Sequence, residues 1–202
     1  MPAKMKWSAL SKKIRHRGFF KLTEVELQHD LFAGGQSPVL VREVIDRGQA
    51  VAVLPYDPVR DEVVLVEQFR IGAGDDKNGP WLIEVIAGYQ EAGESAEEVV
   101  HREAFEEAGC RLSDVERMHR CYSSPGGSNE QVQTFLARTD TSGISGIHGL
   151  DEEGEDIMVH VVSSQQAFDW LDNGRIDSAM PIIALQWFRI NRQRIRRQWL
   201  QR

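Results

Sequence analysis

Seven glutamates and a single arginine, Arg102, lie between residues 91 and 107. Glu103, Glu106 and Glu107 are close enough in sequence for a helix to project their side chains from one face. Carboxylates at this spacing repel one another and destabilise an isolated helix. Several carboxylates aimed at one point are typical ligands of a hard divalent cation, and a partly hydrated shell favours Mg²⁺ or Mn²⁺ over zinc. A solvated acidic helix face is the competing interpretation.

The residues around this cluster predict the helix that positions it, over residues 94–108. Ser95 and Glu98 have the spacing of a capping box, and Gly109 is suited to end the helix with a positive φ. Burial of the other helix faces would keep the carboxylates together beside a core. The apolar residues available for that burial are Val99, Val100, Ala104, Phe105 and Ala108.

The segment from Gly88 to Cys110 resembles the signature of the Nudix family, G-x5-E-x7-R-E-U-x-E-E-x-G-U. Every fixed letter is present, and only Cys110 departs, because a larger aliphatic residue is usual there. The resemblance implies a hydrolase of nucleoside diphosphates linked to another group, which uses Mg²⁺ or a similar ion such as Mn²⁺. It implies metal ligands at the Ala87 carbonyl, Glu103, Glu106 and Glu107, and structural roles for Gly88, Glu94, Arg102 and Gly109, with Arg102 paired to Glu94.

Further segments are similar to the ADP-ribose pyrophosphatase group of that family. The similarity runs from about Arg17 to the C-terminal helix, and the first sixteen residues match nothing recognisable. Pro125, fifteen residues after Cys110, is typical of the group, although Ser-Pro-Gly-Gly is also an ordinary turn. The other similar segments are residues 17–20, 41–43, 46–48, 57–70 and 143–150.

Hydrolysis of a phosphoanhydride also needs a carboxylate that aligns or deprotonates the attacking water. Residues 151–156 contain five acids in a loop that carries Gly154, where mobility would permit closure over a substrate. By resemblance Glu153 is the base and Glu155 is an additional metal ligand. Glu152 is adjacent, so the register stays open, and a solvated acidic loop is the alternative.

The group resemblance also implies the substrate contacts. Arg70 has the planar guanidinium that clamps a phosphate, and a Ser-Pro-Gly-Gly loop can present backbone N–H groups to an anion. Sequence alternation alone favours Phe19 and Phe20 as core residues, whereas the resemblance implies that they stack on adenine across a symmetric homodimer. The implied substrate contacts are Phe19, Phe20, Arg42, Glu43, Arg47, Arg70, Ser124, Pro125, Gly126 and Glu130.

The order of the elements predicts an α+β fold. With the resemblance, we expect a Nudix-type α/β/α sandwich with a mixed sheet, and a small N-terminal β subdomain. Residues 1–48 form the subdomain, which serves dimerisation and substrate contact, and residues 49–202 form the hydrolase domain. Ile183, Trp187 and Ile190 are expected to share one face of the last helix. We predict strands over residues 19–30, 39–45, 49–55, 62–69, 81–87, 117–122, 131–138 and 157–162, and helices over 94–108, 164–172 and 181–200.

Composition excludes some partners. The 202 residues carry 24 basic and 31 acidic side chains, a net charge of −7, which disfavours nucleic acid as a partner of the whole surface. No apolar stretch is long enough to span a membrane. The two cysteines form no disulfide framework, so we expect a cytoplasmic protein. The substrate is expected to be ADP-ribose; the alternatives are a broader nucleoside-diphosphate-sugar hydrolase, for example of GDP-mannose, or a non-catalytic ADP-ribose sensor.

Overall fold

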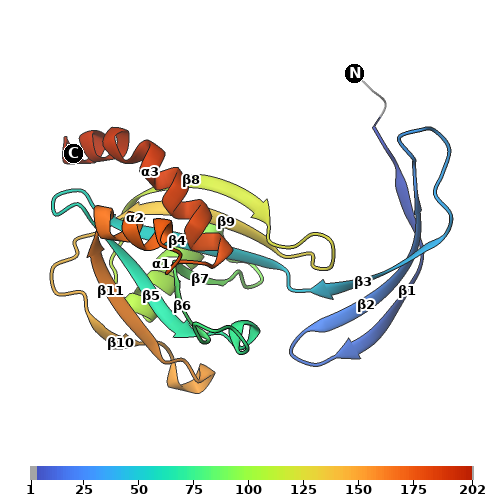
Figure 1. The fold of residues 1–202 in the computed structure, drawn as a ribbon, viewed down its shortest axis with the longest axis horizontal. Helices are drawn as coiled ribbons and strands as arrows, with labels where there is room; N and C mark the ends of the chain where they lie inside the picture. The colour runs from blue at the N-terminus through green and yellow to red at the C-terminus, as the bar shows by residue number, and fades with distance from the viewer. Residues whose placement is uncertain (1–3, 202) are drawn as a thin grey trace. The chain divides into compact units, whose positions relative to one another are not determined.

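The computed structural model describes residues 4–201 of the chain, and Figure 1 shows their fold. The chain forms two compact units. The first contains the chain up to Gln49 together with Tyr122–Gln131, and the second contains Ala50–Cys121 and the chain from Val132 onward. Among the described residues, no helix is both long enough and apolar enough to cross a membrane.

The first unit is built on a three-stranded antiparallel sheet of β1 (Trp7–Arg17), β2 (Lys21–His29) and β3 (Leu40–Asp46), in that order. Strand β1 was missed by the sequence prediction, whose first strand, over residues 19–30, corresponds to β2. Every residue of β1 is exposed, and the β1–β2 register shifts twice, so the strand has no regular apolar alternation to detect.

The segment Tyr122–Gln131 is joined to the end of β3 by backbone hydrogen bonds. The Ile45 N–H donates to the Gly127 carbonyl over 2.8 Å, and the Asn129 N–H donates back to the Ile45 carbonyl over 3.2 Å. The Gln131 N–H donates to the Gly48 carbonyl over 3.2 Å. This segment, distant in sequence from the rest of the first unit, is therefore an integral part of it.

The second unit contains an eight-stranded sheet in the order β10-β11-β5-β4-β9-β8, with β6 paired to β5 and β7 paired to β4. The single run expected over residues 81–87 is two strands, because its first half pairs with β5 and its second half with β4. The strands are β4 (Gln49–Asp57), β5 (Glu62–Phe69), β6 (Trp81–Glu84), β7 (Ile86–Tyr89), β8 (Ser113–Tyr122), β9 (Gln131–Arg138), β10 (Gly146–His148) and β11 (Ile157–Ser163).

Helices cover both faces of this sheet. Strand β4 shows the arrangement: Ala52, Leu54 and Tyr56 pack in one core with α2 (Ser164–Asp172) and α3 (Ala179–Leu200). Val51 and Val53 pack in a second core with α1 (Ala96–Ala108). Burial on both faces explains why β4 reads as a continuous apolar run rather than an alternating one. The predicted α+β class and α/β/α sandwich are confirmed (Figure 1).

Helix α3 buries a different face from the predicted one. Ile190 is 82% exposed, so the stripe expected through Ile183 and Trp187 is wrong. The helix is apolar on several sides near its start, and the contact of Phe188 with Tyr56, at 4.7 Å between ring centroids, selects the buried side. The buried residues are Pro181, Ala184, Leu185, Phe188, Ile195 and Trp199.

A tight turn at Asp61 holds these helices to the sheet. Asp61 has a φ of 60°, unusual for a residue other than glycine. Its carboxylate accepts hydrogen bonds from the Tyr56 hydroxyl over 2.9 Å and from Ser164 Oγ over 3.0 Å. Arg192 of α3 donates to the same carboxylate through Nε over 2.8 Å. One side chain therefore links β4, the start of α2 and α3.

Candidate active site

Helix α1 carries most of the predicted metal ligands and has the predicted capping residues. Ser95 Oγ accepts from the Glu98 N–H over 3.3 Å, and the Glu98 carboxylate accepts from the Ser95 N–H over 2.7 Å. Gly109 ends the helix with a φ of 62°. The helix begins at Ala96, two residues later than expected, because Ser95 is the capping residue. Phe105, expected to be buried, is 59% exposed.

Two glutamates of α1 are held against β7. Glu107 is only 3% exposed, and its Oε2 accepts a hydrogen bond from the Ala87 N–H over 3.2 Å. The Glu103 carboxylate lies directly over Gly88, where any Cβ would overlap it. Gly88 therefore lets the Glu103 carboxylate lie against the strand, because a Cβ at this position would displace that carboxylate.

Arg102 lies at the centre of the ion pairs in the box. Its Nε donates to Glu94 over 3.1 Å, which is the predicted pair, and its Nη1 donates to Glu103 over 2.7 Å and to Glu106 over 3.1 Å. The hydrogen bond to Glu94 raises the pKa of Arg102 above its ordinary value. Arg102 thus connects the loop before α1 to the acidic face of the helix.

The carboxylates of this face act on one another. Burial, together with the nearby charges of Glu103 and Glu155, raises the pKa of Glu107 to about 8. Burial also raises the pKa of Glu103, an effect that Arg102 opposes and that Glu106 and Glu155 reinforce. Glu155, from the loop before β11, is therefore close enough to α1 to interact with these side chains, as the resemblance implies.

The carboxylates beside β7 have the donor chemistry of a metal site, although they are not arranged as one in this structure. Within residues 4–201, no three acidic, histidine or cysteine side chains are arranged to hold an ion as they stand. The reason is visible on α1, because Arg102 engages both Glu103 and Glu106. The chemistry of the donors nevertheless fits, since carboxylate and carbonyl oxygens suit a hard divalent cation. A cation would also offset the repulsion that acts on the buried Glu107.

The predicted base lies on the loop that follows β10. The Gly149 N–H donates to the Glu106 carbonyl over 3.3 Å, which fixes this loop to α1, and the Leu150 N–H donates to the Glu155 carboxylate over 3.1 Å. Glu153 ends a short 3₁₀ helix, η2 (Asp151–Glu153). Its side chain is exposed and makes no hydrogen bond or ion pair within the described part of the chain.

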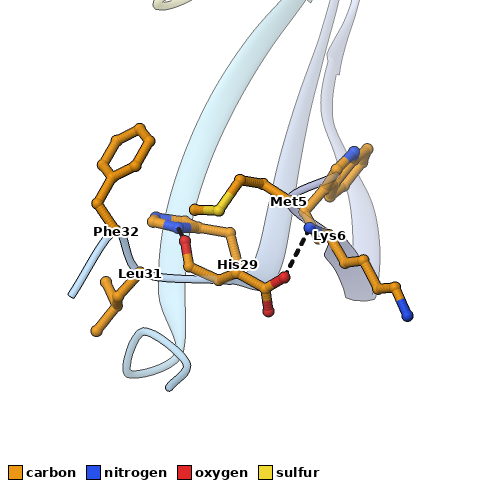
Figure 2. A pocket seen from close by; sticks show the side chains of 7 residues that line it. Met5, Lys6, His29, Leu31 and Phe32 are labelled. Carbon is orange, nitrogen blue, oxygen red and sulfur yellow. Dashed lines mark hydrogen bonds between the residues drawn. The ribbon is translucent and has the colours of Figure 1, made fainter. Parts of the chain in front are cut away.

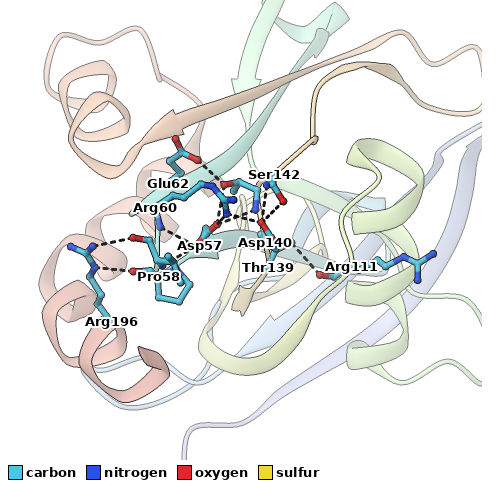
Figure 3. A network of polar contacts seen from close by, with 11 residues as sticks. Asp57, Pro58, Arg60, Glu62, Arg111, Thr139, Asp140, Ser142 and Arg196 are labelled. Atoms are coloured by element: carbon cyan, nitrogen blue, oxygen red, sulfur yellow. Dashed lines mark hydrogen bonds and ion pairs between the residues drawn. The ribbon is translucent and has the colours of Figure 1, made fainter. Parts of the chain in front are cut away.

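A polar network around Asp57 holds the loop between β9 and β10 (Figure 3). Asp57 is 2% exposed, and its Oδ2 accepts from the Thr141 N–H over 3.1 Å and from Thr141 Oγ1 over 3.0 Å. Arg60 Nη1 donates to Asp57 over 2.8 Å and to Asp140 over 2.7 Å. The network ties the β4–β5 turn to the loop between β9 and β10.

Arg70, the predicted phosphate ligand, follows β5 and begins a second 3₁₀ helix, η1 (Ile71–Ala73). It is close enough to Glu107 to affect the pKa of that residue. Its Nε donates to Glu84 Oε2 over 2.7 Å. The sequence analysis did not single out Glu84 as a functional residue. It is the one acidic residue within the apolar run of residues 81–87, and that exception could have indicated a role.

The remaining predicted substrate-contact residues lie in the first unit, and four of them contact one another. Phe19 and Phe20 form an edge-to-face pair with centroids 4.8 Å apart in the bend before β2. The Arg47 guanidinium lies 4.6 Å from the centre of the Phe20 ring, and its Nε donates to Glu130 over 2.7 Å. Phe19 is 92% exposed, so the core position favoured by alternation is wrong.

The other predicted contacts of the first unit are exposed. Arg42 and Glu43 lie on β3, where Arg42 Nη1 donates to the Val41 carbonyl over 2.8 Å. Ser124, Pro125 and Gly126 form a turn closed by the Ser128 N–H, which donates to the Ser124 carbonyl over 2.9 Å.

A pocket of about 290 Å³ also lies in the first unit (Figure 2). The Lys6 N–H donates to the Asp30 carboxylate over 2.8 Å at its edge. None of the predicted site residues lines it. Its lining residues are Met5, Lys6, Trp7, His29, Asp30, Leu31 and Phe32.

Comparison with known proteins agrees with this geometry. Residues 46–183 match the family model of the NUDIX domain. The chain belongs to the Nudix family. Nudix hydrolases generally use a divalent metal ion, and the oxygen donors gathered around α1 of this Nudix domain have the chemistry to bind one.

Two relatives of this Nudix protein are similar over nearly the whole chain. The ADP-ribose pyrophosphatase of Escherichia coli (strain K12) is 45% identical over 94% of this chain and 91% of its own length. The ADP-ribose pyrophosphatase of Haemophilus influenzae is 44% identical over 94% of this chain and 89% of its own length. The GDP-mannose pyrophosphatase of Enterobacter sp. (strain 638) is 34% identical over 74% of this chain and 78% of its own length. A crystal structure of an ADP compounds hydrolase has the same fold, with a TM-score of 0.72 and 20% sequence identity. The match covers 95% of this chain and 97% of that chain.

Proposed function

We propose that the chain is an ADP-ribose pyrophosphatase that uses Mg²⁺, with Mn²⁺ as a substitute. Water would cleave the diphosphate of ADP-ribose and yield AMP and ribose 5-phosphate. The observation that carries this proposal is the convergence of mutually repelling glutamates, one of them the buried Glu107, beside the Ala87 strand. The similarity to two ADP-ribose pyrophosphatases over 94% of the chain supports the choice of substrate.

The metal ion would be held by oxygen atoms. Glu103 and Glu106 would exchange Arg102 for the ion and leave Arg102 paired with Glu94. A divalent ion, when bound, polarises a phosphoryl oxygen and lowers the pKa of a bound water. The proposed ligands are the Ala87 carbonyl, Glu103, Glu106, Glu107 and Glu155.

The chain itself would supply the base and the phosphate contact. Glu153 would take a proton from the attacking water, whose oxygen bonds to one phosphorus while the bridging P–O bond breaks. The bridging oxygen would leave with the other phosphate. Exposure of Glu153 next to Gly154 suits a side chain that reaches substrate when the loop closes. Arg70 would bind a phosphate with its guanidinium.

The first unit, residues 1–48 in the proposed division, would serve dimerisation and substrate contact. A three-stranded sheet needs apolar packing to be stable, yet β1 is exposed along its whole length. We therefore propose a homodimer in which Phe19, Phe20, Arg47 and Glu130 of one subunit serve the active site of the other. Arg42, Glu43 and the Ser124–Gly126 turn would complete the contacts. Exposed large apolar residues support this proposal: Trp7, Leu10, Ile14, Phe19, Phe32 and Val41.

A cytoplasmic location belongs to the same proposal. Both cysteines are free thiols, as expected in a reducing compartment. The proposed partners are a small nucleoside-diphosphate sugar as substrate and a second copy of the chain as the other subunit.

The test is hydrolysis of ADP-ribose in ¹⁸O-labelled water with Mg²⁺, which reports turnover, the products and the attacked phosphorus together. Glu107→Gln should remove most turnover and keep the fold. Wild-type turnover in that variant would refute the metal site. A higher kcat/KM for GDP-mannose than for ADP-ribose would favour the second candidate, which the relative at 34% identity supports. Tight binding of ADP-ribose without hydrolysis would indicate a sensor.

A further inference from the structure

The contact between Arg70 and Glu84 uses only one nitrogen of the guanidinium group, Nε. Glu84 Oε2 accepts from Arg70 Nε over 2.7 Å. The Nη1 and Nη2 atoms of Arg70 make no hydrogen bond or ion pair with any residue between 4 and 201. A guanidinium held through Nε in this way keeps both Nη groups for an anion, and these are the groups that donate to two oxygens of a phosphate.

Strand pairing places the two side chains on one face. In the β5–β6 pair, Val66 faces Glu84 and Gln68 faces Leu82. The Arg70 N–H donates to the Pro80 carbonyl over 2.7 Å, which continues the same pairing by one step. Because alternate residues of a strand share a face, Arg70 and Glu84 project to the same side of the sheet.

A serine that could cap α3 holds Glu84 instead. Ser178 occupies the position before α3, but its side chain accepts no hydrogen bond from the helix. Ser178 Oγ donates to Glu84 Oε1 over 3.3 Å. Both oxygens of Glu84 therefore have partners, and its side chain is only 16% exposed, so the carboxylate has a defined orientation.

We propose that Glu84 is a positioning residue for substrate binding: it fixes Arg70 through Nε so that the Nη edge faces the diphosphate, and Ser178 fixes Glu84. This inference rests on the proposed function, in which Arg70 binds a phosphate. Glu84 touches neither substrate nor metal in this scheme, and it acts only through the arginine.

The size of the expected loss of kcat/KM in Glu84→Ala follows from the way in which Arg70 is held. Without Glu84, the long side chain of Arg70, which is 44% exposed, has no partner that selects its rotamer. Misplacement of a binding group by about 1 Å lowers rates by up to about 100-fold, so Glu84→Ala should lower kcat/KM by roughly 10- to 100-fold. Glu84→Gln keeps an acceptor but loses the charge-assisted bond, and its loss should be several-fold smaller.

A double-mutant cycle tests this directly. Wild type, Glu84→Ala, Arg70→Ala and the double variant are compared for kcat and KM with ADP-ribose, for ADP affinity by calorimetry, and for melting temperature. We expect the double variant to be no more than about twofold worse than Arg70→Ala, because residues that act through one another are not additive. Ser178→Ala should show a smaller loss. Glu116→Ala, which breaks an arginine–carboxylate pair of similar length, with Arg194 at 2.6 Å, is the matched control and should keep kcat/KM.

The proposal is overturned if Glu84→Ala lowers kcat/KM by the same factor with and without Arg70, or does not lower it at all. A silent Arg70→Ala would overturn it as well, while leaving ADP-ribose hydrolysis by the wild type intact. If the wild type instead binds but does not hydrolyse ADP-ribose, the proposed function fails. The ADP affinities of the same four proteins then decide the Arg70–Glu84 coupling alone.

Discussion

Replacing Asp57 with asparagine should destabilise the folded protein by about 2.5 kcal/mol at neutral pH. Burial by itself raises the pKa of this carboxyl, but the Thr141 N–H and the backbone and guanidinium of Arg60 outweigh it and lower the pKa to about 2. The usual value is 3.8, and the difference of almost two units multiplied by about 1.4 kcal/mol gives the magnitude.

The sign of the pH dependence is fixed by the direction of the shift. A carboxyl whose pKa is lower in the folded state contributes its stability above its unfolded pKa, near pH 4, and loses it as the pH falls toward 2. The difference in unfolding free energy between wild type and Asp57→Asn should therefore be largest above pH 5. It should be smaller by about 1 kcal/mol at pH 3.

Urea unfolding of both proteins between pH 3 and pH 7 measures this difference, provided that the two share one m-value. Asp140→Asn is the matched control, because Asp140 contacts the same Arg60 but its side chain is 70% exposed. A surface ion pair of this kind contributes little to stability. A difference for Asp57→Asn that does not change with pH would refute the argument, since the carboxylate would then owe its contribution to packing rather than to charge.

Three further outcomes can be measured. Gly88→Ala should lower kcat at least about tenfold, because its methyl group displaces the Glu103 carboxylate; wild-type kcat would contradict this. Ser95→Ala should destabilise the protein by about 1 kcal/mol in thermal unfolding through loss of the α1 cap, and a change of similar size in Glu98→Ala would support the capping box. Cys110 is 1% exposed and burial raises its pKa to about 12, so a thiol reagent at pH 8 should label one cysteine of the native protein and two in urea.

The Nudix box could be predicted from the sequence because its constraints are local. The helix ends depend on Ser95, Glu98 and Gly109, which act within a few residues of themselves. The spacing of Glu103 and Glu107 on one helix face follows from helix geometry alone. The pairing of Arg102 with Glu94 spans eight residues, and the structure has it as expected.

Elements without local periodicity were not predictable in the same way. Strand β1 carries no buried residue, so its pairing with β2 left no pattern of alternation. The buried side of α3 was mispredicted because apolar residues surround its first turns and only contact with Tyr56 selects among them. Phe105, apolar and on α1, is exposed because the sheet covers another side of that helix.

The sequence by itself determined the family, the fold class, the capping residues of α1 and the set of carboxylates that repel one another there, because each depends on residue types at short, fixed spacing. Only the tertiary structure decided that Glu84 holds Arg70, that Asp57 anchors the loop between β9 and β10, and that the Tyr122–Gln131 segment belongs with the N-terminal sheet. These contacts join residues from separate strands and loops. Their partners are selected by strand register and burial, which no spacing along the chain records.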